Sequence, residues 1–309
     1  MNESTIKLPS ASLMKKQLIP LLVLLSGAIY GCEKAADIQL KSTDDLLVVD
    51  ASIENGRPPV VILSKSFNYF SQLSPTLLSK SFVHGAVISL SDGSKTVQLK
   101  EYVVSGTAGI RLYFYSADST NPAQVMLGKL NTAYSLTILV NGKTYTANTT
   151  IPKLAKTVDS LWSKPAPNNP DTLKRVLFAR ITDPPGLGNY IRYFTSVNDS
   201  AFLPGSNSAY NDDIVDGTTY DIEVSKGVDR NAEINRDEEG YFKKGDTVQT
   251  KLCNIDKAHF DFWRTLEFSQ QSIGNPFSQP GVVLGNISGG ALGYFGGYAA
   301  QYRKLVIVR

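Results

Sequence analysis

The stretch YSLTILVNGKTYTANTTI, residues 134–151, contains the strongest β-hairpin signal in the chain. Apolar and polar residues alternate along its first half, which predicts a strand with one buried face. Asn141-Gly142 separates the two halves, and this dipeptide favours the type I′ turn that joins antiparallel strands. The large apolar side chains of the first half fall on one face: Tyr134, Leu136, Ile138 and Val140.

Shorter runs of the same kind precede the hairpin and predict further strands. Asn55-Gly56, Pro58-Pro59 and Asp92-Gly93 separate these runs and are typical turn sequences. The spacing of strands and turns predicts a sandwich of about seven strands, Ig-like or transthyretin-like, over residues 46–152. The runs that precede the hairpin are 46–53, 60–67, 86–91, 96–102 and 110–114.

The pattern changes after Pro152. Prolines 165, 167 and 170 lie in SLWSKPAPNNPDTL, a density that favours a semi-extended linker over residues 153–172. Strand patterns return in a second β-rich domain over residues 173–309. We expect one short helix there, over residues 257–271, with Asp256 as its N-cap and Phe260, Trp263 and Leu266 covering a sheet. The predicted fold class is therefore mainly β, with two domains.

The beginning of the chain has the pattern of an export signal. Lys15-Lys16 precede an apolar run that is too short to cross a bilayer, which needs about 20 apolar residues. The run ends in Ile29-Tyr30-Gly31-Cys32, which resembles a bacterial lipobox. We therefore predict a signal peptide over residues 1–31 with its true start at Met14, and an acylated Cys32 that begins a tether over residues 32–45. The alternative is an ordinary signal peptide whose cleavage leaves a cysteine.

Composition and charge exclude several classes of protein. The chain has 309 residues and a net charge of +3, and removal of the leader leaves 28 basic against 27 acidic residues. Because no basic cluster remains, we expect no nucleic-acid partner. With Cys32 acylated, Cys253 is the single remaining thiol, so no intramolecular disulfide can form. The strand pattern around Cys253 predicts that its thiol is buried and inert.

Residues that could perform catalysis are scarce. His84 and His259 have no metal-ligand spacing, and we expect them to serve surface or packing roles. DRNAEINRDEEG, residues 229–240, lacks the glycine and the final glutamate of an EF-hand loop. Two interpretations stay open for an acidic segment nearby, a loose calcium site or ordinary solvated loop charge. We therefore predict no catalytic residue, no metal site and no cofactor, and a protein that is not an enzyme. The acidic segment contains Asp212, Asp213 and Asp216.

Glycines are dense in GNISGGALGYFGG, residues 285–297. One interpretation is a set of bulges and corners where backbone approaches backbone. The other is a loop that docks a partner protein through exposed aromatic side chains. The aromatic side chains in question are Tyr294, Phe295 and Tyr298.

Several segments, taken in order, resemble one family. The lipobox, LVVDASIENGRPPVVILSKS, GKTYTANTTIP followed by VDSLW, DPPGLGNYIRYF and NISGGALGYFGGY are similar to Bacteroidetes-type outer-membrane lipoproteins of domain-of-unknown-function family 4249. The resemblance implies a two-part β protein associated with TonB-dependent outer-membrane transporters, and it assigns no catalytic residue.

The sequence and the resemblance together lead us to expect a lipoprotein held in the outer membrane by acylated Cys32. The charged pair Glu33-Lys34 after the cysteine favours the outer face of the cell. The expected role is that of a non-enzymatic accessory or solute-binding partner of a TonB-dependent barrel, with an unidentified ligand. The alternative is a structural or adhesive surface protein with Ig-like domains.

Overall fold

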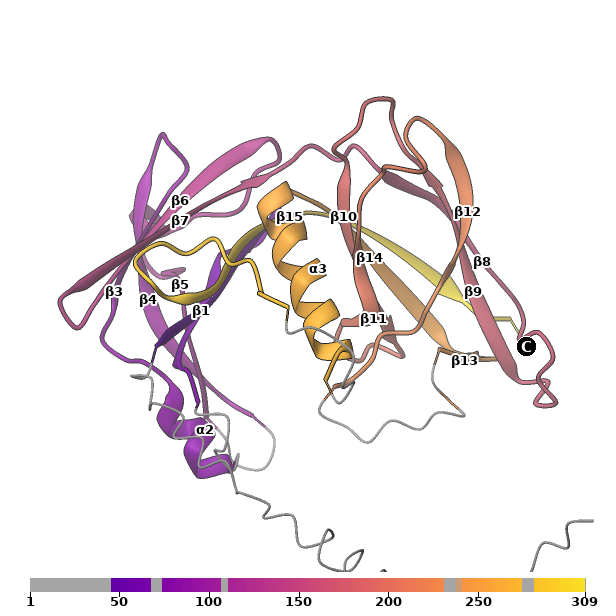
Figure 1. The fold of residues 1–309 in the computed structure, drawn as a ribbon, viewed down its shortest axis with the longest axis horizontal. Coiled ribbons are helices and arrows are strands. Elements are labelled where there is room, and N and C mark those ends of the chain that lie inside the picture. Colours follow the sequence, from indigo (N-terminus) through magenta and orange to yellow (C-terminus); the bar gives the residue numbers. More distant parts are fainter. Residues whose placement is uncertain are drawn as a thin grey trace, which may run out of the picture. The chain divides into compact units, whose positions relative to one another are not determined.

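A computed structural model describes residues 46–67, 74–106, 111–230, 238, 240–273 and 281–308. Residues 43–309 form one compact unit. The predicted signal peptide, the Cys32 acylation site and the tether over residues 32–45 lie outside the described residues. The prediction of a mainly β fold is confirmed, because most elements in the described ranges are strands (Figure 1).

The predicted hairpin is confirmed as strands β6 (Thr132–Val140) and β7 (Lys143–Ile151). Asn141 and Gly142 at its turn have φ angles of 51° and 72°, which lie in the left-handed region that a type I′ turn requires. The strands of the hairpin alternate between buried and exposed residues, so one face of each packs in the core.

The remaining elements of this half surround the same core. Most of its buried side chains come from β1 to β7, which matches the prediction of about seven strands. A short helix and a 3₁₀ turn lie between them. The elements are β1 (Leu47–Glu54), β2 (Val60–Lys65), α2 (Pro75–Ser81), β3 (Val87–Ser91), β4 (Thr96–Ser105), β5 (Arg111–Ala117) and η2 (Pro122–Gln124).

The second half adds a small sheet and extends a large one. The small sheet has the strand order β12-β9-β13, and β8 also pairs with β9. The large sheet has eleven strands, in the order β11-β10-β14-β15-β1-β2-β5-β4-β3-β6-β7. The strands of this half are β8 (Thr157–Pro165), β9 (Lys174–Thr182), β10 (Tyr190–Val197), β11 (Leu203–Tyr210), β12 (Thr219–Val224), β13 (Phe242–Lys243), β14 (Thr247–Ile255) and β15 (Leu292–Val306).

The predicted linker over residues 153–172 is wrong for most of its length. Residues 157–165 form β8, which pairs in antiparallel fashion with β9. Pro165 ends the strand, and the other two prolines follow it in the turn that leads to β9. The prolines therefore border a strand, where their missing N–H costs no ladder hydrogen bond.

Strand β15 belongs to both halves of the chain (Figure 1). Residues 292–298 pair in parallel with β1, and residues 299–306 pair in antiparallel fashion with β14. Phe295 and Ala299 of this strand lie in the core formed by β1 to β7. Strand β15, which is 15 residues long, therefore completes the first half and also joins it to the second.

The second part of the glycine-dense segment, from Leu292 onward, belongs to strand β15. A Cβ atom at Gly297 would lie 2.5 Å from the Thr150 carbonyl oxygen, which is too close for any side chain. Gly293 has a φ angle of 103°, and a Cβ there would lie on the Val49 carbonyl. The interpretation of close backbone approach is confirmed at these two positions.

The predicted helix is confirmed as α3 (Lys257–Gln271). Asp256 is its N-cap, and its Oδ1 accepts a hydrogen bond of 2.9 Å from the His259 N–H. The face that the helix buries differs from the prediction, because Phe260 and Trp263 are only half-buried. Polar residues share the buried face, which is why the apolar pattern misplaced it. The fully buried helical residues are His259, Phe262 and Glu267.

Candidate functional site

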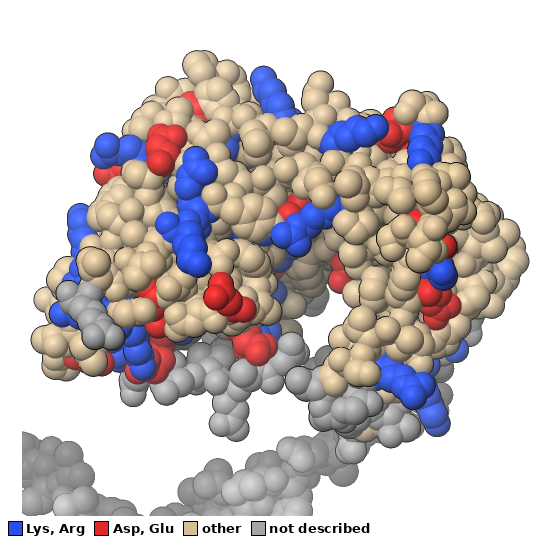
Figure 2. All heavy atoms as spheres, turned by 180° about the vertical axis from the view of Figure 1, so that it is seen from behind, with Lys and Arg blue, Asp and Glu red and all other residues tan. Residues whose placement is uncertain are grey.

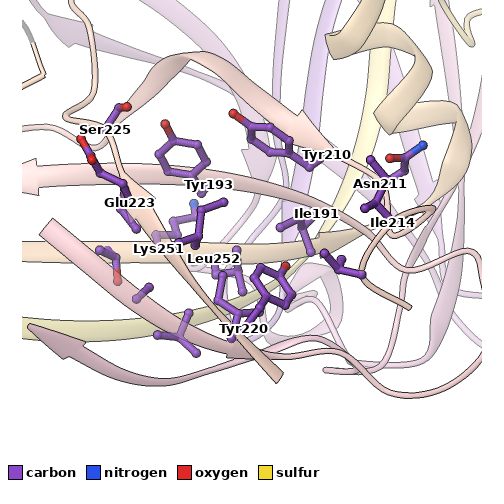
Figure 3. A pocket seen from close by; sticks show the side chains of 17 residues that line it. Ile191, Tyr193, Tyr210, Asn211, Ile214, Tyr220, Glu223, Ser225, Lys251 and Leu252 are labelled. Carbon is purple, nitrogen blue, oxygen red and sulfur yellow. The ribbon is translucent and has the colours of Figure 1, made fainter. Parts of the chain in front are cut away.

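A pocket of about 300 Å³ lies between the small sheet and the β10–β14 part of the large sheet (Figure 3). Its floor is apolar and includes Ile191 of β10 and Leu252 of β14. Opposite them, β8 and β9 contribute further aliphatic side chains: Val158, Ala179 and Ile181. This volume is at the lower end of the range of small-molecule sites, and the aliphatic lining favours an apolar ligand.

Three tyrosines give the pocket a partly polar wall. Tyr193 and Tyr210 lie side by side, with ring centroids 6.2 Å apart, and Tyr220 lies across the pocket from them (Figure 3). Gly205 of β11 leaves room for the Tyr193 phenol, since a Cβ atom there would lie 2.1 Å from its hydroxyl. Burial, and then the neighbouring Tyr210, raise the pKa of Tyr193 above its usual value. These hydroxyls are therefore neutral hydrogen-bonding groups at ordinary pH.

One buried hydroxyl at the pocket has no hydrogen-bond partner among the described residues. Thr250 on β14 is 4% exposed, and its Oγ1 makes no hydrogen bond to any residue that the structure describes. An unpaired buried hydroxyl costs about 1–3 kcal/mol. A bound molecule with one suitably placed polar atom would remove that cost.

The rim of the pocket is formed by the segment between β11 and β12. Ile214 of this segment lines the pocket although its side chain is 96% exposed, and Val215 lies beside it. An isoleucine this exposed contributes no hydrophobic burial to the stability of the fold. Its apolar surface is therefore available to a ligand. The sequence gives no signal for this rim, because the segment resembles an ordinary polar loop.

The lining offers little for catalysis. The described lining residues include one carboxylate, that of Glu223, and no histidine or cysteine. A hydrolytic or acid–base mechanism needs at least a nucleophile or a pair of proton-transferring groups in reach of one another. The mainly aliphatic and aromatic lining suits the binding of a small apolar molecule.

Next to the rim, three carboxylates approach one another. One carboxylate oxygen from each of Asp183, Asp212 and Asp216 lies within 4.8 Å of the others. The sequence singled out Asp212 and Asp216, but their companion in the structure is Asp183 and not Asp213. Asp183 follows β9 directly, and its N–H donates a hydrogen bond of 2.9 Å to the Thr218 carbonyl before β12. This pairing places it beside the acidic segment.

The aromatic residues predicted to dock a partner are buried. Phe295 is 0% exposed, and Tyr294 and Tyr298 are 6% exposed. Tyr298 accepts a hydrogen bond of 3.0 Å from Arg192, whose guanidinium lies 3.3 Å from the centre of the Trp263 ring. The interpretation that these residues dock a partner is therefore wrong. Their side chains are buried in the protein and cannot form an exposed contact surface.

The other residues that the sequence singled out lie apart from the pocket. Cys253 is buried as predicted, and burial raises the pKa of its thiol to about 12, so it stays protonated. His84 is half exposed beside Glu101, whose Oε1 is 2.5 Å from the His84 Nδ1. His259 is fully buried between Tyr294 and Tyr298. Most of residues 229–240 lie outside the described ranges.

The distribution of surface charge and the apolarity of the helices bear on what the described part of the chain can bind or cross. Lys and Arg side chains lie among Asp and Glu on the face in Figure 2, without an extended area of positive charge over its described residues. In the described ranges, no helix has both the length and the apolarity that a membrane crossing would need.

Comparison with known families gives one match. The family described as a domain of unknown function (DUF4249) matches residues 33–304. The chain belongs to this family. The match spans both halves of the DUF4249 chain, which fits a fold in which β15 joins them. A search of the curated proteins finds no match to this DUF4249 chain.

Proposed function

We propose that this protein is a non-enzymatic lipoprotein that binds a small, mainly apolar solute and assists a TonB-dependent outer-membrane transporter. The observation that supports solute binding is the pocket of about 300 Å³ between the two sheets. Sandwiches normally fill the space between their sheets with side chains, at crystal-like packing density. A space of this size that opens at an apolar rim favours a ligand site over imperfect packing.

The lining indicates the chemical class of the solute. Aliphatic side chains and tyrosine rings favour an apolar body, which gains about 25 cal/mol for each Å² removed from water. The Thr250 hydroxyl and the neutral tyrosine hydroxyls favour one or two uncharged polar groups, such as a hydroxyl or a carbonyl. A drug-sized ligand gains about 0.3 kcal/mol for each non-hydrogen atom, so we expect micromolar to millimolar binding.

The anchoring and the transporter rest on the sequence. The apolar run that ends at Cys32 supports acylation, and two or three acyl chains give stable membrane attachment. The resemblance of the chain to outer-membrane lipoproteins supports a TonB-dependent barrel as the partner. A solute-binding lipoprotein beside such a barrel would raise the local concentration of the solute at its entrance.

Solute binding is tested with a fluorescent apolar probe and two exposed substitutions. Ile214→Glu puts a charge at the rim of the pocket, and Val282→Glu puts the same charge at another exposed site, where the side chain is 78% exposed. We expect Ile214→Glu to weaken probe binding by about tenfold, and Val282→Glu to leave it unchanged. Both variants should melt like the wild type. Equal binding by all three proteins would contradict a ligand site in this pocket.

Anchoring and partnership are tested in cells. Cys32→Ser should abolish acyl labelling and release the protein from the membrane fraction. Purification of the wild-type protein from detergent-solubilised outer membrane should recover a TonB-dependent barrel. Unchanged labelling of Cys32→Ser would contradict lipidation at this residue, and recovery without a barrel would favour the alternative of an adhesive surface protein.

A further inference from the structure

The acidic group beside the pocket rim has the geometry of a cation site. Ligands on opposite sides of a calcium ion lie about 4.8 Å apart, since each is about 2.4 Å from the ion. The oxygens of Asp183, Asp212 and Asp216 lie within 4.8 Å of one another, so all three can reach one ion. They come from two separate segments of the chain, which a shared ion would hold together.

Backbone N–H groups of the segment after β9 hold two of these carboxylates in place. Gly188 and Asn189 donate hydrogen bonds of 3.0 and 2.9 Å to the two oxygens of Asp212. Gly186 donates one of 2.7 Å to Oδ1 of Asp216. The Asn189 side-chain amide also donates a hydrogen bond of 3.1 Å to Asp212 Oδ2, which fills both acceptor sites of that oxygen. Oδ1 of Asp212 and Oδ1 of Asp216 each accept one hydrogen bond from these N–H groups, so each keeps a lone pair for an ion.

The third carboxylate, that of Asp183, lacks hydrogen-bond partners among the described residues. Asp183 is 2% exposed, and its Oδ1 lies 3.3 Å from the buried Lys156 Nζ. Neither Asp183 oxygen accepts a hydrogen bond from the described residues, and the ion pair with Lys156 is the contact that this carboxylate makes with a cation there. A buried carboxylate that accepts no hydrogen bond is strongly unfavourable unless other groups compensate it. This observation is independent of the proximity of the three carboxylates.

The charges around the group leave room for a divalent cation. Burial, and then the Asp212 and Asp216 charges, raise the pKa of Asp183, whereas Lys156 opposes this effect. Three carboxylates and one ammonium leave a net charge of −2, which a doubly charged ion would balance.

We propose that Asp183, Asp212 and Asp216 bind a hard divalent cation of the calcium type. Oxygen ligands from carboxylates are what calcium prefers, and its irregular coordination suits a site built from loops. The ion would join the end of β9 to the segment that carries Ile214 and Val215. This inference does not depend on the proposed solute binding, because it rests on the carboxylates alone.

The proposal is tested by calorimetric titration of the chelator-treated full chain with calcium chloride. We expect one site for each chain, with a dissociation constant of about 0.1–1 mM, the range of extracellular calcium modules. Asp216→Asn keeps an acceptor for the Gly186 N–H but removes one charged ligand, and we expect about tenfold weaker binding. The exposed Asp216 is suited to this test, because its replacement does not disturb the buried Lys156–Asp183 pair.

Asp213→Asn is the matched control, because Asp213 lies in the same segment but outside the group of three. This variant should bind calcium like the wild type, and both variants should melt within a few degrees of it without calcium. Two results would overturn the proposal: the absence of saturable binding up to about 10 mM calcium, or equal weakening by the two substitutions.

Discussion

Two threonines that face each other across β10 and β14 show how one hydroxyl can serve stability and another a ligand. Thr195 and Thr250 are directly paired and both are buried. Thr195 Oγ1 accepts a hydrogen bond of 2.6 Å from the Gly227 N–H, whereas Thr250 Oγ1 has no partner among the described residues. The difference makes Thr250 the residue at which binding and stability should oppose each other.

We expect Thr250→Val to stabilise the unliganded protein by about 1 kcal/mol, because it removes an unpaired buried hydroxyl and keeps the shape of the side chain. The matched variant Thr195→Val should destabilise the protein by about 1–3 kcal/mol, since it leaves the Gly227 N–H without an acceptor. Urea denaturation measures both effects. Loss of stability in Thr250→Val would show that its hydroxyl is satisfied in the folded protein.

His259 should make the stability of the protein depend on pH. Burial, and then the charge of Arg192, lower the pKa of His259 to about 3, from about 6.5 in an unfolded chain. The unfolded chain therefore binds this proton more readily than the folded one, so stability is lost as the pH falls below about 6.5. We expect a lower free energy of unfolding at about pH 5 than at about pH 7.

The variant His259→Gln should flatten this dependence, because glutamine does not titrate. His84→Gln replaces the other histidine, which is half exposed, and should retain the loss of stability on acidification. Urea denaturation at the two pH values compares the three proteins. The same pH dependence in His259→Gln as in the wild type would assign the effect to other groups.

At the scale of elements, Asp256 joins a helix to a strand. Its Oδ1 caps α3, and its Oδ2 accepts hydrogen bonds of 2.7 Å from the Thr149 hydroxyl and 2.8 Å from the Thr150 N–H. The sequence predicted the first contact from the spacing of the helix. The contacts with Thr149 and Thr150 could be found only in the three-dimensional structure, because these residues are more than 100 positions from Asp256 in the sequence.

Asp256→Ala should therefore cost more than the loss of a simple cap. A lost N-cap costs about 1 kcal/mol, and the unpaired Thr150 N–H adds about 1–3 kcal/mol. The control is Asp261→Ala in the same helix, which breaks an exposed ion pair of 2.6 Å with Lys257 and should cost at most about 0.5 kcal/mol. Thermal and urea denaturation compare the two. A loss of only about 1 kcal/mol in Asp256→Ala, as for a simple cap, would show that the contacts to β7 contribute nothing.

At the scale of the whole molecule, β15 makes the two halves depend on each other. The first half lacks a strand without it, because β1 would lose its parallel partner and Phe295 would leave the core. The second half would lose the partner of β14. An unpaired strand edge and an unfilled core both destabilise a sheet protein.

We expect a fragment of residues 33–152 to be unfolded or aggregated, although it holds all seven strands that the sequence predicted for a sandwich. Removal of residues 292–309 from the full chain should unfold both halves, and the intact chain should unfold in one transition. Circular dichroism and calorimetry measure these outcomes. A fragment of residues 33–152 that melts cooperatively would show that the first half is an independent domain.

Much of the local structure follows from short-range rules in the sequence. Alternating hydrophobicity predicted β6 and β7, Asn141-Gly142 predicted their turn, and Asp256 predicted the start of α3. These features depend on residues within a few positions of one another, so the chain specifies them directly. The membership of one family and the mainly β fold could likewise be predicted.

The candidate site could not be predicted, because its residues come from six strands and two loops. Tyrosines at 193, 210 and 220 look like ordinary strand residues until the two sheets are placed face to face. Asp183 joined Asp212 and Asp216 only through the pairing of β9 with β12. The density of prolines also led to the wrong prediction of a linker over residues 153–172. It gave no sign that residues 157–165 form β8, which pairs with β9.

The sequence by itself determined that residues 132–151 form a hairpin, where its turn lies and which face its strands bury, because those properties depend on neighbouring residues. Tertiary structure alone decided that residues 292–298 complete the first half, that Tyr294, Phe295 and Tyr298 pack inside, and that a pocket remains between the sheets. Strand pairing across some 240 residues depends on which edges and apolar faces remain unsatisfied when all the others have paired, and no local pattern records that.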